Sequence, residues 1–303
     1  MIKSLQWCDD FFVKLAKKLI MKSFLTFILL ILLISCKNQK TNYIVYYNKV
    51  LIADSIMRFE NDTIKSLKKY RKVFKKFEPK NDDRLNEFEN FILLSDYYNK
   101  NFGGKKSLLK LVKLNAFNWE TKKNDKKIIH LLEKYKVDSS DVNNVIKNWN
   151  KNLNKTLIDS FKIALKRDQE ERPSNLKLIK KNVDKNARLL IWTFENYGFP
   201  SSDKIGWFPM LTFLTHMIES DKYPYFEKKL LEYVKSGECA PRDYAMMIDY
   251  NLLFVEKQNK TIYGFNGVEI IDSIQVNKNR KSIGLPGLIH NSKIRKDLKN
   301  QNK

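Results

Sequence analysis

Few residues of this chain match, in type and spacing, a known catalytic or metal-binding pattern. The three histidines, at positions 130, 216 and 290, show no H-x-x-x-H spacing, and the cysteines show no C-x-x-C spacing. The stretch Gly103-Gly104-Lys105-Lys106-Ser107 lacks the first glycine that a phosphate-binding loop needs. The sequence therefore predicts no metal site and no cofactor.

Cys36 ends a stretch with the chemistry of a processed signal. From Met21 the sequence reads MKSFLTFILLILLISC, with a short basic start and an apolar run from Phe24 to Ile34. That run suits a signal-peptide core and is too short to span a bilayer. Its end is similar to a bacterial lipobox, which implies cleavage before Cys36 and modification of Cys36 with acyl chains such as palmitate. An uncleaved signal anchor over 19–35 is the alternative, and it would bury Lys22.

The C-terminal part carries short polar motifs in a recognisable order. They are Asp168-Gln169 with Arg172, Gly198 with Pro200, His216, Asp249 after Tyr244-Ala245, Tyr263-Gly264, and Arg280 with Gly284-Leu285. In this order they resemble the bacterial family called domain of unknown function 6624, over about Leu165 to Arg295. Three positions depart from the family pattern, since Tyr250 replaces an arginine and Phe265-Asn266 replaces Thr-Gln. The resemblance implies no activity.

The polar residues among these motifs could do acid–base chemistry if they converge. Asp168 and Arg172 lie at i and i+4, so they share one helix face. His216, oriented by Asp168 or Asp249, would act as a general base in a small hydrolase or lyase. The alternative is a buried Asp–Arg–His network with a purely structural role, which we favour because the sequence offers no convincing nucleophile. Supporting residues would be Gln169, Arg172, Tyr263 and Arg280.

Helices must position these residues, because apolar side chains recur at three- and four-residue spacing from Tyr43 onward. Asp62-Thr63 is a capping signal for a second helix, and Asp82-Asp83 is one for a third. The first helices weakly resemble tetratricopeptide-type hairpins, with the resemblance carried by Ser66, Tyr70, Val73 and Pro79. Asn266-Gly267, between two apolar segments, predicts a β-hairpin. The expected fold is mainly α, with N-terminal helical hairpins followed by an α-rich domain that bears this hairpin.

The charge of the chain is strongly positive but spread along its length. Without residues 1–35 the chain keeps 52 basic and 32 acidic residues, a net charge of +20. Lysine pairs recur throughout, so we expect a solvated basic surface that suits anionic lipid and argues against a nucleic-acid partner. Cys239 would be the one cysteine left without a modification or a partner, and we expect it to be structural.

These features predict a membrane-anchored protein of the cell envelope. The expected parts are a signal at 1–35 (translation starting near 21), a tether at 36–42, helical hairpins at 43–160, a C-terminal domain at 161–295 and a disordered tail at 296–303. Outer-membrane delivery is favoured, because Lys37 rather than aspartate follows Cys36. The expected function is binding of a protein, peptide or envelope-polymer partner, and acid–base catalysis by His216 is the alternative.

Overall fold

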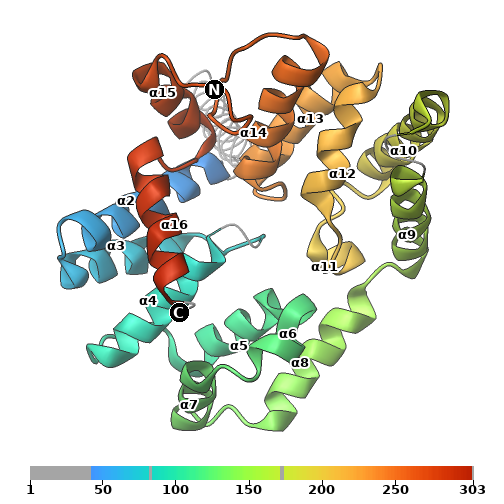
Figure 1. The fold of residues 1–303 in the computed structure, drawn as a ribbon. Coiled ribbons are helices and arrows are strands. Elements are labelled where there is room, and N and C mark those ends of the chain that lie inside the picture. Colours follow the sequence, from blue (N-terminus) through green and yellow to red (C-terminus); the bar gives the residue numbers. More distant parts are fainter. Residues whose placement is uncertain (1–41, 82–83, 171–173, 302–303) are drawn as a thin grey trace, which may run out of the picture. The chain divides into compact units, whose positions relative to one another are not determined.

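The computed structural model describes residues 42–81, 84–170 and 174–301, and these residues form helices and no strand (Figure 1). The signal, the tether and Cys36 lie outside the described residues. Because the described residues form helices and no strand, the expectation of a mainly α fold is confirmed. The elements of the first half are α2 (Tyr43–Phe59), α3 (Thr63–Lys76), α4 (Leu85–Tyr97), α5 (Gly104–Leu114), η1 (Ala116–Asn118), α6 (Trp119–Lys122), α7 (Lys126–Lys134) and α8 (Ser139–Asn152).

Aromatic side chains make the core of this first half. The ring of Phe74 on α3 contacts those of Phe88 and Phe91 on α4, with centroids 4.9 and 5.3 Å apart. Such edge-on and tilted pairs add to the stabilisation from burial alone. The Asp62 carboxylate accepts a hydrogen bond from the Lys65 backbone N–H at 2.8 Å, so the predicted cap of α3 forms. The other predicted cap, Asp82-Asp83, lies outside the described residues.

A second core is built by the helices that follow. They are α9 (Lys155–Gln169), α10 (Leu176–Asn196), α11 (Ser202–Ile205), α12 (Met210–His216), η2 (Met217–Glu219), α13 (Tyr223–Ser236), α14 (Pro241–Tyr250), the π-helical turn η3 (Asn251–Val255), α15 (Ser273–Ile283) and α16 (Leu288–Gln301). The buried apolar residues of this core run from Leu157 to Leu285. Those of the first core run from Tyr43 to Val142.

Helix α2 joins the two cores, and from Asn42 onward the chain is one compact unit. The ring of Tyr43 lies so close to Gly237 that a Cβ at Gly237 would come within 2.5 Å of it. Tyr47 covers Gly284 in the same way, with 2.6 Å to an added Cβ. Both glycines have positive φ, of 84° and 88°, which a residue with a Cβ rarely adopts.

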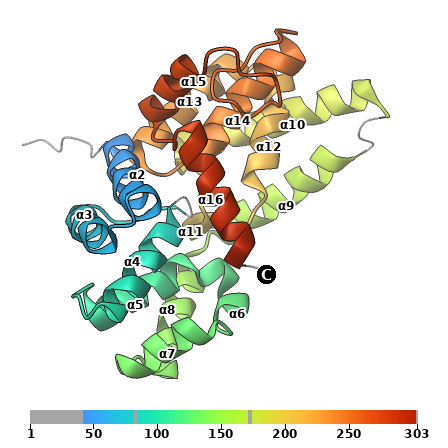
Figure 2. The ribbon, with the colours of Figure 1, turned by 60° about the vertical axis from the view of Figure 1, so that its left-hand side comes forward.

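The last helix returns to α2, as Figure 2 shows. His290 donates to the buried Asp54 carboxylate at 2.7 Å, and Arg58 bridges Asp54 and Asp297. Helix α16 thus extends through Gln301, although the sequence predicts a disordered tail from 296. Its Asp297 pairs with Lys293 four residues earlier and with Arg58 of α2, and the contact with Arg58 is one that no local pattern predicts.

The predicted β-hairpin around Asn266-Gly267 does not form, and this expectation is wrong. The backbone N–H groups of Ile262, Tyr263 and Phe265 all donate to the carboxylate of Asp249. Because each N–H is used once, a strand here could not pair with a neighbour. The segment is instead an irregular loop wrapped around one buried carboxylate.

Candidate functional site

Asp168 and His216 meet, as the acid–base hypothesis requires. His216 Nδ1 lies 2.6 Å from Asp168 Oδ2, and Gln169 donates to the same oxygen at 2.7 Å. The Asp168 side chain is buried, while 24% of the His216 side chain is exposed. An ionised carboxylate only accepts hydrogen bonds, so Nδ1 carries a proton and Nε2 of a neutral ring is the site that can accept another. That is the arrangement of an oriented general base.

Local sequence places both residues at helix ends. Leu157, Phe161, Ala164 and Asp168 recur at four- and three-residue spacing, so Asp168 continues the buried face of α9. Phe161 of that face packs on Phe213 of α12, with ring centroids 5.9 Å apart. The aromatic contact sets α12 against α9, and the last residue of α12 is His216.

Gln169 is the expected supporting residue that the described part of the chain places beside this pair. Arg172 lies outside the described residues. Cys239 is fully buried in the second core and its thiol donates to the Ala240 carbonyl at 3.5 Å. Among the described residues, no three His, Cys, Asp or Glu side chains are grouped as a metal ion would need.

Asp249 serves the loop between η3 and α15 rather than His216. It is fully buried, and its two oxygens accept hydrogen bonds from four donors at 2.8 to 3.0 Å, namely the Thr261 hydroxyl and three backbone N–H groups, of which that of Tyr263 also reaches the second oxygen at 3.2 Å. A carboxylate satisfied by that many donors is a structural anchor. The interpretation of Asp249 as the partner of His216 is therefore not supported, and Asp168 takes that place.

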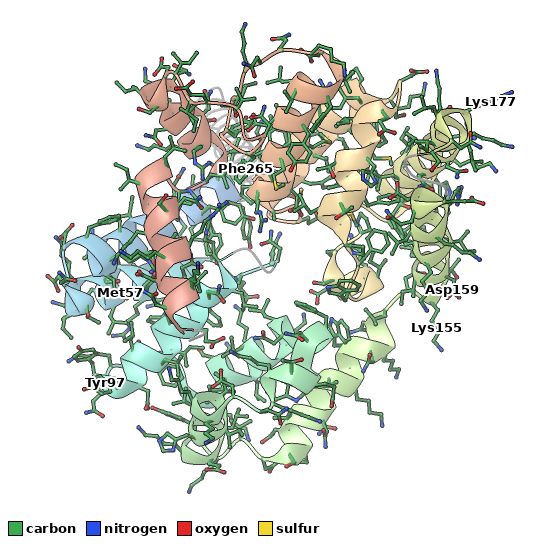
Figure 3. The ribbon with its side chains drawn as sticks, in the orientation of Figure 1. Met57, Tyr97, Lys155, Asp159, Lys177 and Phe265 are labelled. Atoms are coloured by element: carbon green, nitrogen blue, oxygen red, sulfur yellow. The ribbon has the colours of Figure 1, made fainter. Side chains whose placement is uncertain are left out.

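Tyr263 and Arg280 belong to the same anchored loop. Arg280 donates to the carbonyls of Tyr263 and Pro286, at 2.5 and 2.6 Å, and its guanidinium lies 5.0 Å from the Phe265 ring centroid. Phe265 is labelled in Figure 3. Burial raises the pKa of Tyr263 to about 12, so its hydroxyl stays protonated at neutral pH.

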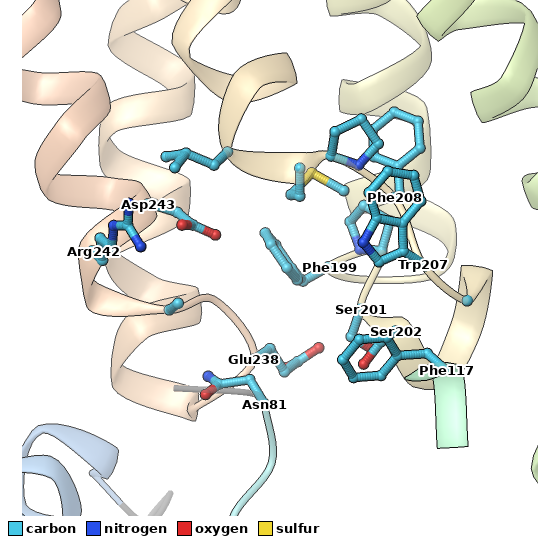
Figure 4. Close-up of a pocket in the computed structure, with 16 residues that line it drawn as sticks. Asn81, Phe117, Phe199, Ser201, Ser202, Trp207, Phe208, Glu238, Arg242 and Asp243 are labelled. Atoms are coloured by element: carbon cyan, nitrogen blue, oxygen red, sulfur yellow. The ribbon is translucent and has the colours of Figure 1, made fainter. Parts of the chain in front are cut away.

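A pocket of about 280 Å³ is lined mainly by the second half, with Asn81 and Phe117 from the first half, and sequence reasoning missed it. We call it the aromatic pocket. Figure 4 shows Phe117, Trp207 and Phe208 on one side and Arg242 with Asp243 on the opposite side. The Trp207 residue is 70% exposed. The sequence signal was Gly206-Trp207-Phe208-Pro209, where a glycine and a proline flank two aromatic residues and indicate a loop; α12 begins after it, at Met210.

No protein-family model matches the chain, and no curated protein or solved structure matches it either. The resemblance to the domain of unknown function 6624 family therefore stays a prediction. Within the described residues, no helix has the length and apolar character needed to cross a membrane.

Proposed function

We propose that this chain is a lipid-anchored envelope protein that binds a sugar-containing envelope polymer in the aromatic pocket. The observation that carries the proposal is Trp207, whose indole stays largely exposed in a pocket that also presents charged side chains. An exposed tryptophan leaves apolar surface in water, and covering it with a ligand stabilises the complex.

Polar residues of the same pocket suit the polar edge of a sugar. Asp243 lies across from the aromatic residues, Glu238 lines the pocket, and Ser201 and Ser202 lie beside Phe117 (Figure 4). Sugar rings combine an apolar C–H face with hydroxyl groups around the edge, so an aromatic wall facing carboxylates matches both. A volume of about 280 Å³ is at the small end for ligand pockets and suits one or two rings of a longer chain.

The pocket is tested by titrating the full chain with soluble oligomers of N-acetylglucosamine and following tryptophan fluorescence. Trp207→Ala should abolish the saturable change in tryptophan fluorescence that the wild type shows on binding. Trp192→Ala is the matched control, because Trp192 is 42% exposed on α10 and lines no wall of this pocket. Equal loss in both variants, or no saturation with the wild type, would refute sugar binding; saturation with a peptide instead would reassign the ligand.

The anchor is tested separately by mass spectrometry of the mature N-terminus. We expect a chain that starts at Cys36 and carries acyl chains, and an unmodified chain for Cys36→Ala. An uncleaved, unmodified wild-type N-terminus would refute the anchor and leave the pocket untouched.

The 2.6 Å contact between His216 and Asp168 supports a second candidate, acid–base cleavage of the same polymer. Wild type and His216→Gln are incubated with purified envelope polymer, and released fragments are identified by mass spectrometry. Fragments that only the wild type releases would establish catalysis. If wild type releases none, His216 is a structural residue.

A further inference from the structure

A second pocket, of about 430 Å³, is lined by four of the nine arginines in the chain. We call it the arginine pocket. Its arginines come from far apart in the sequence: Arg58 on α2, Arg84 before α4, Arg242 on α14 and Arg295 on α16. The chain contains 48 lysines, yet none of those in the described ranges lines this pocket. Arginine differs from lysine in offering a planar fork of donors that matches phosphate oxygens.

The acidic residues of the arginine pocket do not balance its charge. Among the lining residues that the structure describes, Glu87 and Asp297 are the two carboxylates, which leaves a formal excess of two positive charges. Asp297 is engaged by Arg58 and Lys293, at 2.5 and 3.2 Å. Arg242 and Arg295 form no ion pair with any residue that the structure describes. Both arginines are exposed residues, so a ligand can reach them.

A fifth arginine lies in the wall. Arg280 is only 1% exposed, and it contacts Phe265 and Pro286, which both line the arginine pocket. Its Nη2 atom has no hydrogen-bond partner within the described ranges. Burial, together with repulsion from Arg295, lowers the pKa of Arg280 to about 10. Positive charges crowded in this way repel one another, and a bound anion would relieve that repulsion.

We propose that the arginine pocket binds a phosphate group, with Arg242 and Arg295 donating to its oxygens. A doubly charged phosphate matches the excess of two positive charges. Three amide side chains on the same walls, those of Asn86, Asn90 and Asn291, offer further donors. This site is distinct from the aromatic pocket, with which it shares only Arg242. Failure of sugar binding would leave it intact.

The test is calorimetric titration of the full chain in detergent micelles with inorganic phosphate, at constant ionic strength. We expect saturable binding that Arg295→Gln weakens about tenfold or more, the usual effect of losing a charge-assisted hydrogen bond. Arg295→Lys should restore only part of the affinity, because lysine lacks the fork. Arg188→Gln makes the same charge change on α10, away from the lining residues, and should leave binding unchanged.

Two further ligands separate the sources of phosphate. Glycerol 3-phosphate represents a free monoester, and glycerophosphoglycerol represents the diester of a lipid headgroup; the tighter of the two identifies the source. Since the pocket matches two charges, we expect the monoester to bind more tightly. The proposal is overturned if phosphate does not saturate, if acetate binds equally well, or if Arg188→Gln weakens binding as much as Arg295→Gln and Arg242→Gln do.

Discussion

Replacing Asp249 with asparagine should destabilise the whole unit, because one carboxylate organises the loop between η3 and α15. Its Oδ1 accepts from Ile262 N and Tyr263 N, at 2.8 and 3.0 Å, and its Oδ2 accepts from Phe265 N and Thr261 Oγ1, at 2.8 and 2.9 Å. The side-chain amide in the Asp249→Asn variant would keep one accepting oxygen. The other position becomes an NH₂ group that faces donors, whichever way the amide is turned.

Two charge-assisted hydrogen bonds are then lost, at about 1.5–3 kcal/mol each, for a total of about 3–6 kcal/mol. That is a large fraction of the ordinary stability of a domain, which is about 5–15 kcal/mol. Urea unfolding followed by circular dichroism measures it. With a slope near 3 kcal/mol per molar urea, the midpoint should fall by about 1–2 M.

The matched control is Asp272→Asn in the same segment. Asp272 is exposed and caps α15 by accepting from Gln275 N at 2.9 Å, and asparagine caps helices equally well. The free energy of unfolding of Asp272→Asn, taken from its urea midpoint, should change by less than about 0.5 kcal/mol. If Asp249→Asn behaves like Asp272→Asn, the loop is not anchored by the carboxylate and the explanation for the missing hairpin is wrong.

Three other predictions concern glycine packing, acid stability and the candidate base. Gly284→Ala adds a Cβ within 2.6 Å of Tyr47 at a φ of 88°, whereas the Cβ of Gly267→Ala, at a φ of 78°, meets nothing within 4 Å. The free energy of unfolding should fall by about 1 kcal/mol in Gly267→Ala and by at least about 1 kcal/mol more in Gly284→Ala. Equal losses in the two variants would contradict the clash with Tyr47. Burial raises the pKa of Asp54, but hydrogen bonds from His290 and Arg58 outweigh burial and lower the pKa overall. The free energy of unfolding should therefore fall as the pH drops below about 4 towards that lowered pKa, and this dependence on pH should be weaker in Asp54→Asn. An unchanged pH dependence in the variant would refute the role of Asp54. Nitrogen NMR should find the proton of neutral His216 on Nδ1, and Asp168→Ala should shift it towards Nε2; a wild-type proton on Nε2 would contradict the orienting role of Asp168.

Much of the helical framework could be predicted, because helix formation depends on nearby residues. The three- and four-residue spacing of apolar side chains from Tyr43 onward identified α2, and Asp62 identified the start of α3. The contact between Asp168 and His216 was one of two alternatives considered, and the structure selects it. Which of the two carboxylates reaches His216 depends on the packing of Phe161 against Phe213, which no local pattern specifies.

The loop after η3 was predicted wrongly for a physical reason. Asn266-Gly267 is a good hairpin turn when the flanking N–H groups are free to pair between strands. Here Asp249, more than ten residues earlier, accepts hydrogen bonds from those N–H groups, so they cannot pair between strands. A turn propensity of about 1 kcal/mol cannot compete with several charge-assisted hydrogen bonds to a buried carboxylate.

The sequence by itself determined that the chain is helical, which faces of its helices are apolar, and that a lipobox-like segment precedes them. Those properties follow from spacing over a few residues. Only the tertiary structure brought Arg58, Arg84, Arg242 and Arg295 to one pocket and placed Trp207 at another. The arginines span more than two hundred positions, and each looks like one more basic residue in a basic chain. Their meeting depends on how α2, α14 and α16 pack, and the contact of His290 with the buried Asp54 is one of the interactions that hold α16 against α2.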